Sequence, residues 1–117
     1  MKSIAIVYSE DHVRDHLDKI LTNEGFQVFP YYDPQDVIEH CHLIEPSLYL
    51  INYKNVNIDG FELYKKLVEK KGKDKVKVVF ISSHHEIEEE AYNLGGLDFI
   101  KVPFENDDII KRIISLA

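Results

Sequence analysis

The sequence is short of the residues that would indicate a disulfide scaffold, a membrane span or a nucleic-acid binder. Cys41 is the single cysteine of 117 residues, which excludes an intramolecular disulfide and favours a reducing compartment. No apolar run approaches the roughly 20 residues that a membrane helix needs. With 14 basic and 21 acidic residues the net charge is −7, which argues against direct contact with nucleic-acid backbones. We expect a cytoplasmic protein with one domain over residues 1–117.

What the sequence does contain is a short apolar strand followed by an amphipathic helix, repeated along the whole chain. Continuous apolar runs predict strands that are buried on both faces. The strands are expected at residues 4–7, 26–31, 48–51, 76–82 and 97–101. The helices are expected at about 10–24 and 34–44, around 61–72, from 84 to 94, and around 109–114.

This alternation predicts an α/β fold with a parallel five-stranded sheet, because each right-handed crossover returns the chain to the same edge. The doubly wound, flavodoxin-like order 2-1-3-4-5 has its switch point between the first and third strands, where such folds bind ligands. The residues at the strand tips around that point are Tyr8, Ser9, Glu10, Asn52, Ser82, Ser83, Lys101 and Val102. The sequence thus places a neutral amide, Asn52, at the tip of its most apolar strand.

Four segments in this order resemble the receiver domain of two-component response regulators, the CheY-like family. They are IAIVYSED, NVNIDGFEL, VVFISS and GGLDFIKVPF. The residues that match the family pattern are Asp59, Gly60, Ser82, Asp98, Phe99, Pro103 and Phe104. The resemblance implies bacterial-type signal transduction and a cis bond between Val102 and Pro103.

The resemblance also implies which positions carry the chemistry, namely phosphoryl transfer from a histidine kinase to an aspartate. The aspartate position holds Asn52, the acidic pair falls on Tyr8 and Ser9, and the lysine position holds Val102. Only the hydroxyl position, Ser82, keeps its residue type. An amide lacks the charge and basicity of a nucleophile, and Mg²⁺ requires carboxylates that these residues do not supply. We therefore expect a degenerate receiver, with no catalytic residue, no bound Mg²⁺ and no other cofactor.

The sequence leaves two alternatives open. Glu10 and Asp11 follow the vacated acidic positions and could hold a metal for a nonstandard phosphoacceptor, although both also suit the first turn of a helix. The crevice at Tyr8, Asn52, Tyr53 and Ser82 could instead bind a small molecule. Lys101 is one residue from the lysine position, and strand alternation turns it to the opposite face.

Two histidine pairs suggest metal binding only weakly. His40 and His42 point apart at a spacing of two residues on a helix. His12 and His16 share a face but lack a third ligand. We expect all four on the surface.

In the resembled family, partners dock on the surface of the fourth helix, fifth strand and fifth helix. Here that surface would carry both signs of charge, which suits a symmetric dimer. Its charged residues are Glu86, Glu88, Glu89, Glu90, Asp98, Lys101, Lys111 and Arg112. Phe99 matches the family's switch aromatic and is expected to stay in one state. The sequence predicts a non-enzymatic, phosphorylation-independent interaction module that docks on signalling proteins, on its own output domain or on a second copy.

Overall fold

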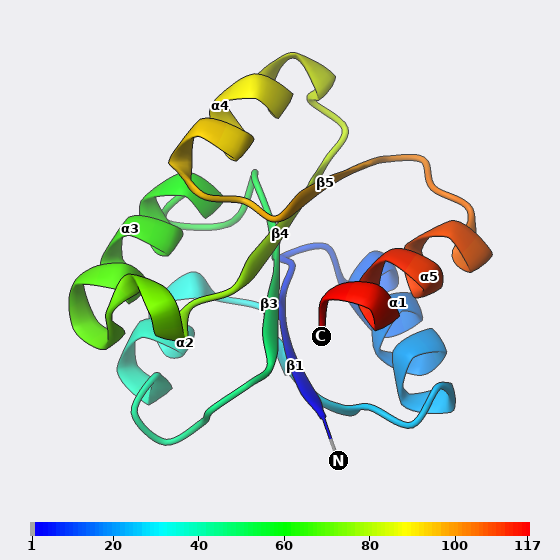
Figure 1. The fold of residues 1–117 in the computed structure, drawn as a ribbon, viewed down its shortest axis with the longest axis horizontal. Coiled ribbons are helices and arrows are strands. Elements are labelled where there is room, and N and C mark those ends of the chain that lie inside the picture. The colour runs from blue at the N-terminus through cyan, green and yellow to red at the C-terminus, as the bar shows by residue number, and fades with distance from the viewer. Residues whose placement is uncertain (1) are drawn as a thin grey trace.

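The computed structural model describes residues 2–117, which form one parallel sheet covered by helices on both faces (Figure 1). The strands are β1 (Ser3–Val7), β2 (Gln27–Tyr31), β3 (Leu48–Asn52), β4 (Val78–Ser82) and β5 (Asp98–Lys101). The α-helices are α1 (Asp11–Asn23), α2 (Pro34–His40), α3 (Gly60–Lys71), α4 (Glu88–Leu94) and α5 (Asn106–Leu116). Two 3₁₀ turns, η1 (Lys73–Lys75) and η2 (His85–Ile87), precede β4 and α4.

The sheet has the order β2-β1-β3-β4-β5 with every pair parallel, which confirms the predicted fold. In Figure 1, α1 and α5 lie on one side of the sheet, and α2, α3 and α4 lie on the other. The chain reverses its winding between β1 and β3, so a crevice opens there at the carboxyl ends of the strands.

Each face of the sheet has its own hydrophobic core because successive strand residues point to opposite sides. In β1, Ile4 and Ile6 pack toward α1 and α5, whereas Ala5 and Val7 pack toward the other three helices. The same alternation runs through β3 and β4, whose apolar residues are almost completely buried. The central strands are therefore rigid supports for the polar residues at their tips.

Side-chain caps define where α2 and α3 begin. The Asp33 carboxylate accepts a hydrogen bond from the backbone N–H of Gln35 at 2.9 Å, and Pro34 occupies the first turn. Asp59 likewise accepts from the N–H of Glu62 at 2.8 Å. Gly60 follows because a Cβ there would lie 2.5 Å from the carbonyl oxygen of Asn52. The Asp59–Gly60 pair thus brings the start of α3 directly against the tip of β3.

The prediction that the second helix extends to residue 44 was wrong, since α2 ends at His40. The Lys71 ammonium group, which is buried against this turn, donates to the carbonyl oxygens of Cys41 at 2.7 Å and Ile44 at 2.9 Å. A lysine from α3 therefore replaces the helical donors, and the chain leaves the helix a turn early.

The prediction that the fourth helix opens at His84 was also wrong. The Ser82 hydroxyl accepts a hydrogen bond from the backbone N–H of His84 at 2.9 Å, which forms a local turn. Residues His85–Ile87 then form η2, and α4 begins only at Glu88. The fourth and fifth strands also begin later than expected, at Val78 and Asp98.

Tyr49 provides a test of the packing, because its hydroxyl is buried in the core without a hydrogen-bond partner. We expect Tyr49→Phe to raise the free energy of unfolding by about 1 kcal/mol, since it removes an unsatisfied polar group. Urea denaturation measures the change. Leu50→Ala, on the opposite face of the same strand, is the reference and should cost about 2–5 kcal/mol. A clear loss of stability in Tyr49→Phe would show that the hydroxyl has a partner in solution.

Candidate functional site

The switch-point crevice gathers most of the positions that the sequence singled out. It has a volume of about 210 Å³ and lies at the carboxyl ends of β1, β3 and β4. The residues that line it are Tyr8, Glu10, Asn52, Lys54, Ser82, Ser83, His84 and Val102. The crevice is thus polar, with one carboxylate, one ammonium group, an amide, hydroxyls and an imidazole.

Asn52 occupies the tip of β3, and its side-chain amide is hydrogen-bonded to the loop that follows. Its Nδ2 donates to the backbone carbonyl oxygen of Lys54 at 2.8 Å, and the backbone carbonyl oxygen of Asn52 accepts from Asn55 Nδ2 at 2.6 Å. These bonds hold the β3–α3 loop in a tight turn. The Asn52 side chain therefore has a clear structural role that requires no phosphoryl group.

Tyr8 and Ser9 follow β1 and diverge in direction. Tyr8 is 4% exposed and lines the crevice. Burial, with a smaller effect of the Glu10 charge, raises the pKa of the Tyr8 phenol to about 12. The Ser9 hydroxyl instead donates to the carbonyl oxygen of Tyr32 at 2.8 Å and accepts from the Val56 N–H at 2.9 Å. Ser9 thus ties together the loops that follow β1, β2 and β3.

The two acidic residues after Ser9 have separate environments. Glu10 is the residue before α1, makes no side-chain cap and lines the crevice. Asp11 lies in the first turn of α1 and forms an ion pair with Arg14 at 2.7 Å. Only Glu10 therefore brings a carboxylate to the crevice.

Val102 and Lys101 point to opposite sides, as strand alternation predicts. Val102 lines the crevice, and its backbone N–H donates to the carbonyl oxygen of Ser82 at 3.0 Å. Lys101 lies on the α4 side and pairs with Glu88 at 3.4 Å. The bond that follows, between Val102 and Pro103, is cis, in agreement with the resemblance.

His85 makes a contact that sequence reasoning missed. Its Nε2 lies 3.0 Å from the carbonyl oxygen of Val102, which can only accept, so this nitrogen carries the proton. The bond joins η2 to the loop after β5. No local sequence signal predicts it, because the two residues meet only through the pairing of β4 with β5.

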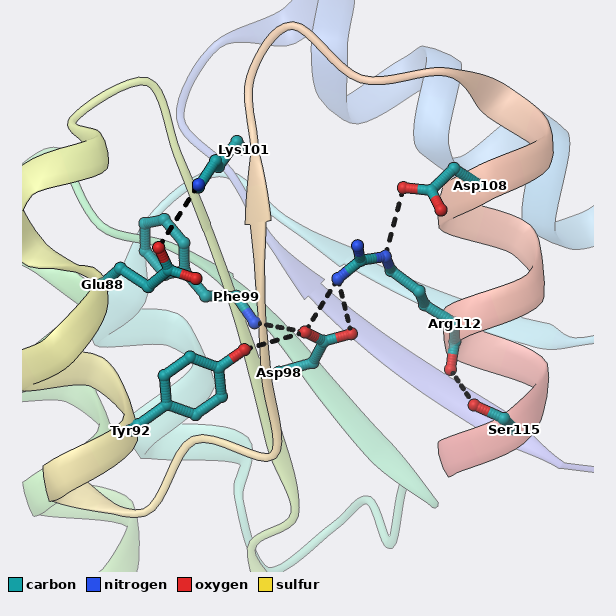
Figure 2. A network of polar contacts seen from close by, with 8 residues as sticks. All are labelled: Glu88, Tyr92, Asp98, Phe99, Lys101, Asp108, Arg112 and Ser115. Atoms are coloured by element: carbon teal, nitrogen blue, oxygen red, sulfur yellow. Dashed lines mark hydrogen bonds and ion pairs between the residues drawn. The ribbon is translucent and has the colours of Figure 1, made fainter.

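The charged face of α4, β5 and α5 is organised around Asp98 (Figure 2). The Asp98 carboxylate accepts two hydrogen bonds from Arg112 of α5, at 2.9 and 3.1 Å, and one from the Tyr92 hydroxyl of α4 at 3.1 Å. Hydrogen bonding and charge from Asp98 raise the pKa of the Arg112 guanidinium. Arg112 also pairs with Asp108 at 3.1 Å, and its carbonyl oxygen accepts from Ser115.

The remaining residues of this face divide into buried and free groups. Phe99 is 2% exposed and packs in the core on the α4 side. In residues 2–117, the ion pairs use Asp98, Lys101 and Arg112 within the chain, whereas Glu86, Glu89, Glu90 and Lys111 take part in none. A groove of about 360 Å³ runs between the elements of this face, lined by Phe99, Lys101, Pro103, Phe104 and Arg112 among others.

The crevice does not fit Mg²⁺, the metal that the resembled family would imply. Mg²⁺ is held by one or two carboxylates together with phosphate oxygens, and the crevice offers Glu10 alone. Within the described chain, no three His, Cys, Asp or Glu side chains come together as a metal site. His16 of the predicted surface pairs lies 2.8 Å from Asn106 Oδ1 and so links α1 to α5.

A parallel five-stranded sheet in the order 2-1-3-4-5, with a polar crevice at its switch point, is the architecture of receiver domains and of other flavodoxin-like α/β domains. Residues 4–114 match the response regulator receiver domain family, and the chain belongs to that family. None of the helices in residues 2–117 has the length and hydrophobicity of a membrane span.

Named relatives support the same assignment. The chain is 25% identical to the regulatory protein VanRc of Enterococcus gallinarum, with 96% of this chain and 48% of that protein covered. It is 26% identical to sporulation initiation phosphotransferase F of Bacillus subtilis, with 98% and 95% covered. The response regulator TrrA of Thermotoga maritima, solved with Mg²⁺ and BeF, has the same fold, with a TM-score of 0.88 at 17% identity and full coverage of both chains. This chain thus spans about half of the VanRc relative and nearly all of the Bacillus relative.

The raised pKa of Tyr8 predicts a loss of stability at alkaline pH. The pKa of tyrosine is 10.0 in the unfolded chain and about 12 for folded Tyr8, so the proton leaves the folded state at a higher pH. The stabilising contribution is complete below the unfolded pKa and is lost as pH rises toward the folded one. As pH rises from about 9 to about 11, we expect the free energy of unfolding of Tyr8→Phe to fall by about 1 kcal/mol less than that of the wild type. Urea denaturation across this range measures the difference, and Tyr32→Phe, at an exposed tyrosine, is the control that should match the wild type.

Proposed function

We propose that this chain is a degenerate receiver domain that acts in two-component-type signalling as a phosphorylation-independent protein-interaction module. The observation that carries the proposal is the amide of Asn52 at the acceptor position, already hydrogen-bonded to the loop after β3. The expected partners are signalling proteins, an output domain of its own chain or a second copy, and the expected setting is the cytoplasm.

Three physical requirements of phosphoryl transfer support this reading. The reaction needs an anionic oxygen nucleophile, and Asn52 supplies an amide. It needs a metal to bridge developing charge, and the crevice has one carboxylate. It needs a fixed cation opposite the metal, and Val102 occupies that position while Lys101 pairs with Glu88 on the other side of the strand. We therefore assign no catalytic residue to this chain.

The docking face supports the interaction role. Its groove is walled by α4, β5 and α5, which Figure 2 shows joined through Asp98. The charges bound within the chain stiffen this surface, whereas Glu86, Glu89 and Glu90 on one side and Lys111 on the other are free to meet a partner. In a symmetric dimer, Lys111 of one copy would face the acidic residues of the other.

Glu10 favours a second candidate function, because its carboxylate does reach the crevice. In that alternative the domain still accepts phosphate through nonstandard residues, with Glu10 holding the metal. Asp11 contributes less to this case because Arg14 engages it.

Incubation with acetyl phosphate separates these two functions. We expect no mass increase of one phosphoryl group on the wild type, with or without Mg²⁺, by intact mass spectrometry. Asn52→Asp tests whether the amide alone is the obstacle, and we expect no adduct there either, since the metal ligands and the cation stay absent. A Mg²⁺-dependent adduct on the wild type that disappears in Glu10→Gln would establish the second candidate instead.

Charge reversal tests the docking face. We expect the wild type to self-associate and Lys111→Glu to raise the dimer dissociation constant about fivefold, because like charges then meet across the interface at a cost of about 1 kcal/mol. Sedimentation equilibrium gives the constants. Lys66→Glu, the same substitution on the exposed side of α3, is the matched control. Equal dimer dissociation constants for the two variants would place the interface elsewhere. A wild type that stays monomeric would mean that the partner of this face is a different protein.

A further inference from the structure

Tyr8 presents an unsatisfied donor to the crevice. Its side chain is almost completely buried and lines the crevice; Arg14 donates to its backbone carbonyl oxygen, and no residue in 2–117 forms a hydrogen bond with its hydroxyl. The neighbouring polar atoms are already engaged, because Asn52 Nδ2 donates to Lys54 and the Ser82 hydroxyl accepts from His84. In residues 2–117 the Tyr49 hydroxyl is the fully buried side-chain group without a partner, so the unpaired Tyr8 hydroxyl reaches the open space of the crevice, where a ligand or solvent can accept its hydrogen bond.

Glu10 and Lys54 add opposite charges to the same crevice. Neither takes part in the ion pairs of the described residues, so the two groups are more than 4.0 Å apart and leave room between them. An acceptor that carries a negative charge and a donor that carries a positive charge thus border one small space. This pattern is complementary to a molecule that carries both charges itself.

The volume of the crevice and the negative charges around it further restrict the class of ligand that fits. At about 210 Å³ the crevice is smaller than the roughly 300–1,000 Å³ of sites for drug-sized ligands, which indicates a small metabolite. Tyr53 packs against His84 of the crevice lining, and its pKa is raised by burial and then by the charges of Asp59, Glu90 and Glu86. This field and the net charge of −7 disfavour a simple anion, and the single carboxylate disfavours a divalent cation.

We propose that the switch-point crevice binds a small zwitterion of the amino-acid class without a metal ion. Glu10 receives the ammonium group, and the Lys54 ammonium and Tyr8 hydroxyl bind the carboxylate. The Tyr8 phenol stays protonated at physiological pH, so it remains a donor. This inference goes beyond the docking role, and it gives the domain an input that needs no phosphoryl donor.

Isothermal titration calorimetry with the standard amino acids, each alone at millimolar concentration, tests the proposal. We expect at least one of them to bind, and we expect acetate and methylammonium, which each carry one charge, to bind at least about tenfold more weakly. Tyr8→Phe should weaken binding about fivefold, as expected for one hydrogen bond, and Glu10→Gln about tenfold or more, as expected for a charged one. Glu24→Gln, at the far end of α1, is the matched control and should bind like the wild type.

Each contrary result overturns the proposal. Absence of heat and of any thermal shift for every amino acid would mean that the crevice is only solvated. Binding of inorganic phosphate that becomes tighter in Glu10→Gln would make it an anion site. Binding that is unchanged in both Tyr8→Phe and Glu10→Gln would place the ligand outside the crevice. None of these results bears on whether the face of α4, β5 and α5 docks a partner.

Discussion

The hydroxyl of Ser9 is the junction on which the crevice depends. It donates to the loop after β2 and accepts from the loop after β3, while the Ser9 backbone N–H donates to Asn55 Oδ1 at 3.1 Å. A carboxylate at this position would lack a donor for the Tyr32 carbonyl oxygen and would need a counter-ion. A neutral hydroxyl needs none. The carboxyl ends of three strands are therefore joined by hydrogen bonds alone.

Other polar side chains around the crevice are also hydrogen-bonded within the chain. Asn52 turns its amide to the same loop, and the positive φ of Asn57 directs its Nδ2 to both oxygens of Asp33 at 2.9 Å. His85 donates to the Val102 carbonyl oxygen and joins the loops after β4 and β5. These side chains bind other parts of the chain, whereas the Tyr8 hydroxyl at the crevice has no hydrogen-bond partner in residues 2–117.

The fold could be predicted well from the sequence because strong, regular patterns of apolar and capping residues specify its strands and helices. Continuous apolar strands, the Asp33–Pro34 and Asp59–Gly60 helix starts, and Gly25 at φ +93° after α1 are local features that tertiary context did not override. The end of α2 and the start of α4 were mispredicted because each is set by side-chain hydrogen bonding that the helical pattern does not reveal. Lys71 reaches the end of α2 from another helix, and Ser82 turns the chain before α4.

The candidate site was predictable in position but not in detail. Because parallel strands end at one edge, spacing alone brings Tyr8, Asn52 and Val102 to one crevice. Hydrogen-bond partners are set by loop geometry, so the roles of Ser9 and His85 could not be read from the sequence. The same limit applies to Asp98 and Arg112, which look like free charges in the sequence and bind each other in the fold.

Asp98 gives the face of α4, β5 and α5 a property that a collection of surface charges would lack. One carboxylate is the shared acceptor of a helix on either side of β5, through Tyr92 and Arg112. The carboxylate therefore holds side chains of α4 and α5 at one position on β5. Removal of the Arg112 guanidinium would therefore alter the hydrogen bonding and the charge around Tyr92 as well, because both side chains share one acceptor.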